Sequence, residues 1–346
     1  RGQLDPRFEV LRDASRPVRG RGVFATQDVK VGTKVMVARQ TAAVPMDRYR
    51  TAFCRRCLVL LDKGTLIKCR RCEDRFCGKG CVIAAAGEVT HEATCGFHKR
   101  SLNEALRMQS EAAYSPAATE TELLRLTMEC LARRRAGLID KLEWEEILNL
   151  DSGETDECAD TAAEEGEEAG APAGGAGGIK LHATMLREAQ ARLKGGRVRV
   201  SEEEIQMVYT RLRRNFYPLQ PEPLGRLLPP TVVAVFPVAA LTNHSCAPNA
   251  CFHTRRNGPG GPPLEYVLRC TNDVKAGEEI CVSYLAHFAT AAKEGRPELL
   301  ERIWGISCDC PCCEVDVPAG SSAGDWRVTK MLEDMEAILE NAQARR

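Results

Sequence analysis

Four pairs of metal-ligand side chains lie close together in the first third of the chain. They follow the pattern Cys-x2-Cys, Cys-x2-Cys, Cys-x3-Cys and His-x3-Cys, all within 42 residues. Thiolate and imidazole are ligands that zinc prefers, and two ligands at this spacing can reach one ion from a knuckle or a helical turn. A segment this small has too little core to fold alone, so bound metal would stabilise it. The pattern predicts two tetrahedral zinc sites built from Cys54, Cys57, Cys69, Cys72, Cys77, Cys81, His91 and Cys95.

A smaller cluster, Cys308-x-Cys310-x2-Cys313, comes late in the sequence, with Cys312 as a spare thiol. Three thiolates are one ligand short of a closed zinc site. The chain has 17 cysteines, which fits either disulfides in a secreted protein or zinc in a reducing compartment. The close spacing favours metal, and the first residues include no apolar stretch typical of a signal peptide. We therefore expect a cytoplasmic or nuclear protein.

A polar string, Leu-Thr-Asn-His-Ser-Cys-Ala-Pro-Asn-Ala, occupies residues 241–250 directly after an apolar segment. No charged residue occurs from Leu227 to Asn243, but prolines interrupt this run and it is shorter than a usual membrane span. We expect a buried strand from Val232 to Val238. Burying Asn, His, Ser and Cys side by side costs free energy unless each finds a partner. The string therefore indicates a ligand-binding site.

Other short segments would position this site. In Arg19–Ala25 two glycines flank an arginine before an apolar alternation, which predicts a tight turn where a ligand can approach the backbone. Alternating hydrophobicity predicts further strands at Lys34–Ala38, at Leu264–Cys270 and from Glu278 to Tyr284. These strands indicate a small β-rich unit.

Helical segments and a spacer separate the β-rich parts. In residues 97–150, and again from about Ser201 to Phe216, apolar residues recur at helical spacing, and the second stretch opens with Ser-x-x-Glu, a capping box. Another helix is predicted from Trp326. Asp151 to Gly178 holds nine acidic residues and no basic one, so we expect a disordered, solvated spacer. The rest of the chain is therefore mildly basic, which allows weak contact with nucleic acid or another acidic partner.

The polar string resembles the cofactor-binding signature of SET-domain protein lysine methyltransferases. The Gly-Arg-Gly turn at residues 20–22 is similar to the first SET motif, and the Gly-Glu-Glu-Ile strand ending in Ser283-Tyr284 is similar to the second half of the SET active site. The order of the first four ligand pairs resembles a MYND finger. Together these features resemble the SMYD family, which has SET and MYND domains in one chain.

The resemblance implies an α+β fold, in which a β-rich SET fold with a pseudoknot carries an inserted MYND zinc finger, a helical insert and a cysteine-rich post-SET segment. Family members often continue into a helical-repeat domain, which we expect to be absent here. The implied parts are the N-terminal part of the SET domain at 1–50, the finger at 51–96, the helical insert at 97–224, the core SET domain at 225–290, the post-SET segment at 291–316 and the start of a C-terminal helical region at 317–346.

The implied activity is methyl transfer from S-adenosylmethionine to a lysine side chain of a histone or another protein. By resemblance, Tyr284 orients the amine and stabilises the developing charge, while Phe216, Tyr217 and Trp304 line the lysine channel. Ile306 stands where relatives commonly carry an aromatic residue that stacks on adenine, so we expect weaker cofactor binding. The implied cofactor residues are Gly20, Arg21, Gly22, Val23, Asn215, Asn243, His244, Tyr284 and Ile306.

The resemblance also implies how the metal ligands are grouped. Ligands of a MYND finger interleave, so the first and third pairs would hold one zinc ion and the second and fourth pairs another. The post-SET zinc takes one cysteine from the polar string. The three expected zinc sites are Cys54, Cys57, Cys77 and Cys81; Cys69, Cys72, His91 and Cys95; and Cys246, Cys308, Cys310 and Cys313.

Two other functions fit parts of the sequence. A SET scaffold with weak or no activity could use its MYND finger to bind proline-containing peptides of partner proteins. A nucleic-acid-binding zinc protein would use the basic body and bind in a salt-dependent way. The intact Asn243, His244 and Tyr284 favour the enzyme, because a scaffold has no use for these three residues. We expect a monomer that works in the cytoplasm and nucleus without membrane contact.

Overall fold

The computed structural model describes the parts of the chain that build the fold. No helix in these parts is both long and apolar enough to cross a bilayer. The expected helix from Trp326, residues 97–119 and the expected spacer from residue 154 onward lie outside the described residues. The described residues are 2–12, 20–61, 66–72, 74–87, 90–95, 120–153, 183–193, 200–220, 230–256, 264–285 and 295–314.

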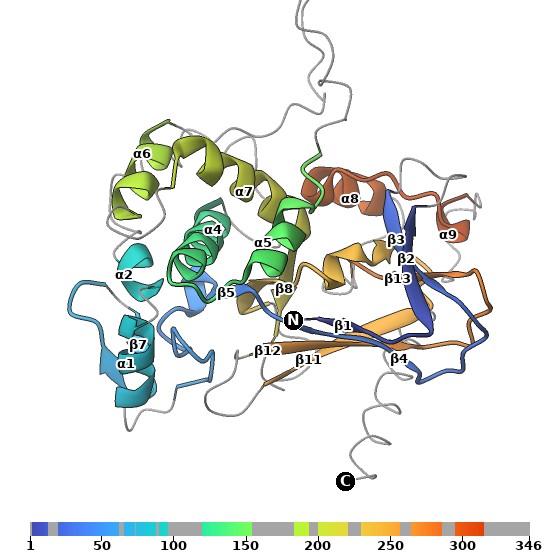
Figure 1. The fold of residues 1–346 in the computed structure, drawn as a ribbon, viewed down its shortest axis with the longest axis horizontal. Coiled ribbons are helices and arrows are strands. Elements are labelled where there is room, and N and C mark those ends of the chain that lie inside the picture. Colours follow the sequence, from blue (N-terminus) through green and yellow to red (C-terminus); the bar gives the residue numbers. More distant parts are fainter. Residues whose placement is uncertain are drawn as a thin grey trace, which may run out of the picture.

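Strands from opposite ends of the sequence pair with one another in two four-stranded sheets (Figure 1). One sheet has the order β1-β4-β12-β11 and the other the order β10-β13-β3-β2. In the second sheet Val23 of β3 lies opposite Ile280 of β13. The predicted strands near residues 34, 264 and 279 are confirmed. The strands of these sheets are β1 Gln3–Leu4, β2 Phe8–Arg12, β3 Arg21–Ala25, β4 Lys34–Arg39, β10 Asn243–His244, β11 Ala250–Arg256, β12 Leu264–Cys270 and β13 Glu279–Val282.

A three-stranded sheet, β5-β9-β8, separates two hydrophobic cores and is apolar on both faces. Its strands are β5 (Ala42–Pro45), β9 (Val232–Val235) and β8 (Phe216–Leu219). In β9, Val233 and Val235 face the helical core, whereas Val232 and Ala234 face the core of the other two sheets. The prediction that this strand reaches Val238 was wrong. It ends at Val235, because Pro237 has no amide hydrogen for a ladder and a short 3-10 helix, Ala239–Leu241, follows.

Helices cover the three-stranded sheet (Figure 1), with α4 packed on β5 and β9 and α7 packed on α4. The predicted helix after Ser201 is confirmed as α7, and the Ser201 hydroxyl accepts a hydrogen bond from the Glu204 amide at 3.1 Å. The capping box is half-formed, because the Glu204 carboxylate pairs with Arg134 of α4. The helices are α1 Lys79–Gly87, α2 Thr90–Thr94, α4 Glu120–Arg135, α5 Lys141–Leu148, α6 Ala183–Arg192, α7 Glu202–Asn215, α8 Arg296–Trp304 and α9 Pro311–Glu314.

The cysteine-rich finger forms a small unit beside α4, built from α1, α2 and the hairpin of β6 (Ile67–Lys68) and β7 (Arg75–Phe76). Buried ion pairs join it to the rest of the molecule: Arg55 contacts Glu129 of α4 at 2.6 Å, and Arg50 contacts Asp74 at 2.9 Å. Burial raises the pKa of Asp74, but Arg55, Arg125 and Arg50 outweigh burial and hold it at about 2. Charged contacts therefore help to dock the finger, together with Ala93 and Leu58, which belong to the two hydrophobic cores.

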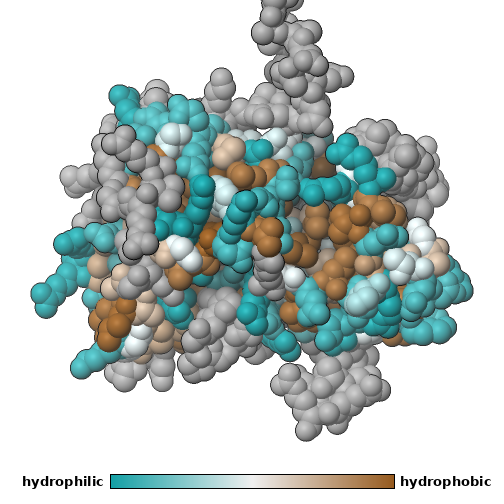
Figure 2. All heavy atoms as spheres, viewed as in Figure 1, coloured by the Kyte–Doolittle hydropathy of each residue, from teal (hydrophilic) through white to brown (hydrophobic). Residues whose placement is uncertain are grey.

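The surface is polar around an apolar centre on the face shown in Figure 2. Hydrophobic residues gather across the middle of this face, between the helices and the strands, and hydrophilic residues surround them.

Among the large hydrophobic residues that the structure describes, Ile83 of α1 is the most exposed, at 71%. The finger thus presents an apolar side chain to solvent.

Candidate active site and metal clusters

The two segments that carry the expected active site lie side by side. β10 and β13 pair in parallel, with Asn243 opposite Cys281 and His244 opposite Val282. This pairing places the polar string directly against the strand that leads to Tyr284. The two segments that the sequence predicts to form one active site are therefore adjacent in the structure.

Tyr284 is held by two hydrogen bonds to the polar string. Its hydroxyl donates to the Thr242 carbonyl at 2.8 Å, and its amide donates to Nδ1 of His244 at 3.0 Å. Because Nδ1 of His244 accepts this bond, a neutral ring carries its proton on Nε2, which lies 3.3 Å from Sγ of Cys246. The imidazole thus connects the backbone of Tyr284 to a candidate metal ligand.

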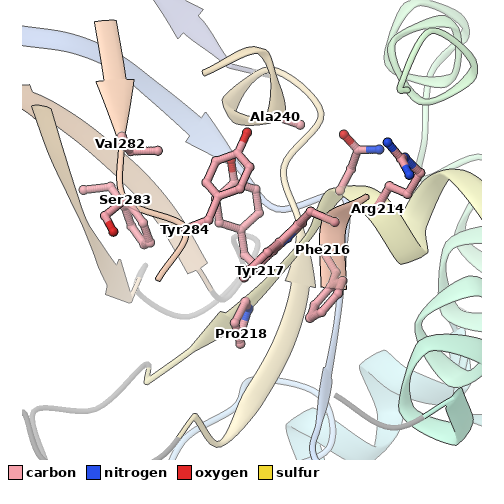
Figure 3. A pocket seen from close by; sticks show the side chains of 11 residues that line it. Arg214, Phe216, Tyr217, Pro218, Ala240, Val282, Ser283 and Tyr284 are labelled. Carbon is pink, nitrogen blue, oxygen red and sulfur yellow. The ribbon is translucent and has the colours of Figure 1, made fainter. Parts of the chain in front are cut away.

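A pocket that is open to solvent lies against the Tyr284 side chain (Figure 3). The predicted channel residues Phe216, Tyr217 and Trp304 all line it, and the Trp304 ring centroid lies 5.4 Å from that of Tyr284. Continuity between α7 and β8 places Phe216 and Tyr217 here, since the helix ends and the strand begins between residues 215 and 216. The other lining residues are Arg214, Asn215, Pro218, Ala240, Phe252, Val282 and Ser283.

The glycine turn at the start of β3 meets the polar string. Asn243 Nδ2 donates to the Arg21 carbonyl at 3.1 Å and to a Glu279 carboxylate oxygen at 2.7 Å. At Gly22 a Cβ atom would lie 2.4 Å from that same Glu279 oxygen, so a side chain here would force the Glu279 carboxylate to move. Gly20 has φ +69° and no atom within 4 Å of a Cβ position. The backbone of residues 20–23 therefore forms a cradle next to Asn243, with open space beside Gly20.

Residues 149–153 also reach this site, which the sequence analysis did not foresee. The Arg21 guanidinium donates to the Asn149 carbonyl. Asn215 Nδ2 donates to the Asp151 carbonyl at 2.9 Å, and Arg214 pairs with the Asp151 carboxylate at 2.9 Å. The expectation of a solvated spacer from Asp151 was wrong for residues 151–153. Their polar composition suggested a linker, and no local pattern marked their contact with distant α7.

Ile306 lies apart from the pocket. It follows Gly305, which ends α8 in a left-handed conformation (φ +65°), and its side chain packs against the helical core. Trp304, two residues earlier, is 5% exposed and takes the place at the pocket wall. Of the expected cofactor residues, the segment Gly20–Val23, Asn243, His244 and Tyr284 lie at the polar string and Asn215 lines the pocket, whereas the contact of Ile306 with adenine stays a prediction.

Cysteine and histidine side chains converge in three clusters. In each cluster the four potential ligand atoms lie within 4.8 Å of one another. Cys246 reaches the third cluster, with its Sγ atom 3.6 Å from that of Cys313 and 4.0 Å from that of Cys308, whereas Cys312 is not a member. The memberships match those expected from the sequence: Cys54, Cys57, Cys77 and Cys81; Cys69, Cys72, His91 and Cys95; Cys246, Cys308, Cys310 and Cys313.

Crowding perturbs the thiols of these clusters. Burial, and then the nearby Cys54, raise the pKa of Cys81 to about 12. Burial and Cys308 raise the pKa of Cys313 to about 12, and hydrogen bonds with Cys308 and Cys310 raise the pKa of Cys246. Thiols packed this closely cannot all ionise without a compensating cation. A divalent metal ion supplies that charge and deprotonates its thiol ligands, so the donor sets fit zinc.

A polar string paired in parallel with a strand that leads to a tyrosine, beside a four-cysteine cluster, is the arrangement expected of a SET-domain protein. The family model for the SET domain matches residues 20–285, and the chain belongs to this family. The match runs from Gly20, directly before β3, to Leu285, shortly after β13, and it includes the finger and the helices that lie between β5 and β8.

Named relatives are protein lysine methyltransferases. The chain is 28% identical over 102 residues to the histone-lysine N-methyltransferase ASHR2 of Arabidopsis thaliana, covering 30% of this chain and 25% of that protein. It is 24% identical over 304 residues to the N-lysine methyltransferase SMYD2-B of Danio rerio, covering 88% and 60%. The chain thus spans from a quarter to three fifths of these relatives.

A solved structure also overlaps with the chain. The SET domain of LSMT, bound to lysine and AdoHcy, has a TM-score of 0.35 and 14% identity, covering 88% of this chain and 54% of that one. This similarity is too low to inform the fold or the site.

Proposed function

We propose that the chain is an S-adenosylmethionine-dependent methyltransferase that acts on lysine side chains of proteins. The observation that carries the proposal is the aromatic pocket around Tyr284, directly beside the paired strands that present Asn243 and His244. The relatives named above are lysine methyltransferases, which supports the same reaction. A scaffold without activity would not need a phenol inside an aromatic pocket.

The residues around the polar string would hold the cofactor. The backbone of residues 20–23 and the Asn243 amide form the cradle described above, and Gly20 leaves space beside it. Asn215 and the Asp151 backbone that it contacts would close one side of the cofactor site. When bound there, S-adenosylmethionine would supply a methyl group activated by its sulfonium charge. The fit supports the proposed cofactor roles of these residues.

The pocket residues would prepare the lysine. Phe216, Tyr217 and Trp304 form apolar walls that exclude water from the lysine side chain, which lowers the pKa of its amine and favours the neutral, nucleophilic form. The Tyr284 hydroxyl, fixed by Thr242, would orient the amine by hydrogen bonding. Holding the amine in line with the methyl group would supply much of the acceleration. The proton would leave to solvent at the open side of the pocket.

Three zinc ions complete the proposal, one at each cluster. Two clusters offer four thiolates and one offers three thiolates and an imidazole, as in closed structural zinc sites, so these ions would stabilise the fold rather than act in catalysis. The cysteines that the structure describes form no disulfide bond with one another, which supports work in the cytoplasm or nucleus, where thiols remain reduced. The substrate would be a histone or another protein that presents lysine in an accessible segment.

Calorimetry with S-adenosylmethionine tests the proposal on the zinc-loaded chain. We expect saturable binding by the wild type and at least about tenfold weaker binding by Asn243→Ala at unchanged zinc content. Lys30→Ala, which removes only an exposed partner of Asp273, serves as the control and should bind normally. Absence of binding heat by a fully zinc-loaded wild type at high protein concentration would reject the enzyme in favour of a scaffold.

Mass spectrometry identifies the substrate. Cell lysate is incubated with the chain and cofactor labelled in its methyl group, and labelled peptides are sequenced. We expect labelled lysine residues that are absent when Tyr284→Phe replaces the wild type. Label on residues other than lysine would contradict the proposed substrate class.

A further inference from the structure

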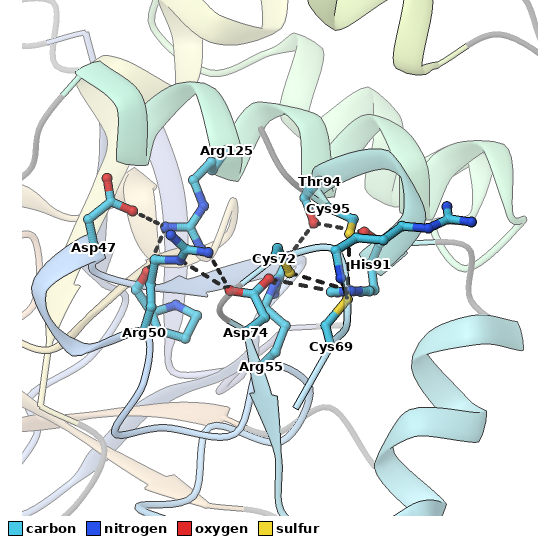
Figure 4. Close-up of polar contacts among 12 residues, drawn as sticks. Asp47, Arg50, Arg55, Cys69, Cys72, Asp74, His91, Thr94, Cys95 and Arg125 are labelled. Carbon is cyan, nitrogen blue, oxygen red and sulfur yellow. Dashed lines mark hydrogen bonds and ion pairs between the residues drawn. The ribbon is translucent and has the colours of Figure 1, made fainter. Parts of the chain in front are cut away.

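Asp74 is an almost fully buried carboxylate at the start of β7, between the second metal cluster and helix α4 (Figure 4). Its Oδ1 atom accepts hydrogen bonds from Nε and Nη2 of Arg50, at 3.1 and 2.9 Å. Its Oδ2 atom is buried without a hydrogen-bond partner in the part of the chain that the structure describes. Oδ2 instead lies 3.7 Å from Nε of Arg55 and 3.7 Å from Nδ1 of His91.

The His91 ring stands between Asp74 and the cluster. Its Nε2 atom lies 3.8 Å from Sγ of Cys72, on the cluster side, whereas its Nδ1 atom is buried and also lacks a hydrogen-bond partner among the described residues. Phe76 packs edge-on against the ring, with 5.1 Å between ring centroids. Oδ2 therefore faces two buried nitrogen atoms that also lack a hydrogen-bond partner among the described residues, Nδ1 of His91 and Nε of Arg55. Such atoms are rare in folded proteins, and a facing pair indicates a contact that forms in another state.

We propose that Asp74 is the positioning residue for the second zinc ion. A neutral imidazole carries one proton, and coordination through Nε2 leaves that proton on Nδ1, where it needs an acceptor. Oδ2 of Asp74 is in place, and a shift of about 1 Å brings it within hydrogen-bond distance. A carboxylate in this position fixes the tautomer and the orientation of a zinc-binding histidine. The inference rests on the zinc proposed above for the Cys69, Cys72, His91 and Cys95 cluster.

The same carboxylate belongs to the contact between the finger and α4. Arg55 lies between Asp74 and Glu129 of α4 and donates to Glu129 at 2.6 Å and to Thr94 at 3.1 Å. A purely structural role would make Asp74 only an ion-pair partner of the arginines. That role would pair Oδ2 with Nε of Arg55, but it leaves the buried Nδ1 atom of His91 without an acceptor. It also predicts that Asp74 and Glu129 variants behave alike towards zinc.

Zinc release to a chelating dye, 4-(2-pyridylazo)resorcinol, separates the two roles in the full zinc-loaded chain. In Asp74→Asn the amide can still accept from Arg50 but cannot accept from Nδ1 of His91 without its own reorientation. We expect one of the three zinc ions to leave at least about tenfold faster, with the other two unchanged. Glu129→Gln, the matched control, removes a buried charge from the same network without touching His91 and should release zinc like the wild type.

Equal acceleration in both variants, or none in Asp74→Asn, would overturn the positioning role. A wild type that lacks zinc at this cluster would overturn the inference together with the metal assignment, while cofactor binding and methyl transfer would still test the proposed reaction. A test that needs no variant is the 15N NMR spectrum of the histidine rings in the zinc-loaded wild type, which reports which ring nitrogen carries the proton. We expect the His91 ring to carry its proton on Nδ1; a proton on Nε2 would reject the inference even if Asp74→Asn fails to fold.

Discussion

At the scale of single residues, the Tyr284 hydroxyl is the group that the proposed reaction depends on most. It donates to the Thr242 carbonyl inside the pocket, so Tyr284→Phe removes one polar group and leaves the ring in place. We expect methyl transfer to fall about 100-fold, since loss of one aligned donor commonly costs this much, with cofactor binding nearly unchanged. Single-turnover methylation and calorimetry measure the two quantities.

The matched control for this change is Tyr209→Phe. Tyr209 is fully buried in α7, and its hydroxyl has no hydrogen-bond partner in the described part of the chain. We expect its loss to leave activity unchanged. Wild-type turnover in Tyr284→Phe would remove Tyr284 from the catalytic role.

His253 of β11 makes stability depend on pH. Burial lowers its pKa to about 4, and Arg269 and Arg255 act in the same direction. In the unfolded chain the ring binds a proton near pH 6.5, so between pH 6.5 and 4 only the unfolded state is protonated. The free energy of unfolding therefore falls as pH decreases through this window. We expect His253→Gln to lose less stability over the window than the wild type.

Denaturant unfolding of both proteins at several pH values measures this difference. Acid would release zinc from the proposed metal clusters equally in both proteins, so the difference between the two curves isolates His253. Parallel curves between pH 6.5 and 4 would contradict the depressed pKa.

At the scale of elements, β3 lies against the polar string at Gly22, within the proposed cofactor site. A Cβ at Gly22 would displace the Glu279 carboxylate, which lies 2.4 Å away, and crowd the Asn243 amide at 3.1 Å. We expect Gly22→Ala to weaken cofactor binding about tenfold or more, because the Asn243 amide loses its position. Calorimetry measures the affinity.

Gly80→Ala is the control for this change. Gly80 lies in α1 with no atom within 4 Å of a Cβ position, and alanine favours helix over glycine by about 0.5–1 kcal/mol. We expect Gly80→Ala to bind cofactor with wild-type affinity and to have a slightly higher free energy of unfolding. Unchanged cofactor affinity in Gly22→Ala would show that this approach does not shape the site.

The strands show which elements can be predicted from sequence. Leu264–Cys270 and the strand before Tyr284 have alternating patterns and were predicted correctly. Ala42–Pro45 and Phe216–Leu219 were not predicted as strands, because they are short and buried on both faces, so no alternation marks them. They form strands because they pair with β9, which neither segment reveals by itself.

The candidate site also contains some residues that could be predicted from the sequence and others that could not. The metal ligands were predictable because zinc restricts residue type and spacing, and Tyr284 and Asn243 were found by resemblance to a known family. The contacts of Asn149 and Asp151 were not predicted. The Asn149 carbonyl accepts a hydrogen bond from Arg21 of β3. The Asp151 carbonyl accepts from Asn215 of α7, and its exposed carboxylate pairs with Arg214 of the same helix. Such contacts depend on tertiary structure and leave no local signal.

At the scale of the whole molecule, the third cluster fastens the C-terminal described segment to the polar string. Cys310 is 1% exposed and belongs to this cluster, whereas the adjacent Cys312 does not. We expect Cys310→Ser to retain two zinc ions instead of three and to lose cofactor binding about tenfold or more, because Trp304 and His244 are no longer held. Elemental analysis and calorimetry measure these effects.

Cys312→Ser is the control for the third cluster. It changes a thiol two residues from Cys310, in the short helix α9, and should keep three zinc ions and normal cofactor binding. Three zinc ions in Cys310→Ser would show that the cluster does not bind metal as proposed.

The pairing of β3 with β13 and of β5 with β9 has a consequence for synthesis of the chain. Residues 23 and 280 are partners, as are residues 44 and 233, so β3 has only β2 beside it and β5 has no strand partner until most of the polypeptide has left the ribosome. Closing loops of this length slows folding. During this interval Val23, Val44 and similar side chains are exposed to solvent, and translation arrested before residue 230 would yield a product prone to aggregation.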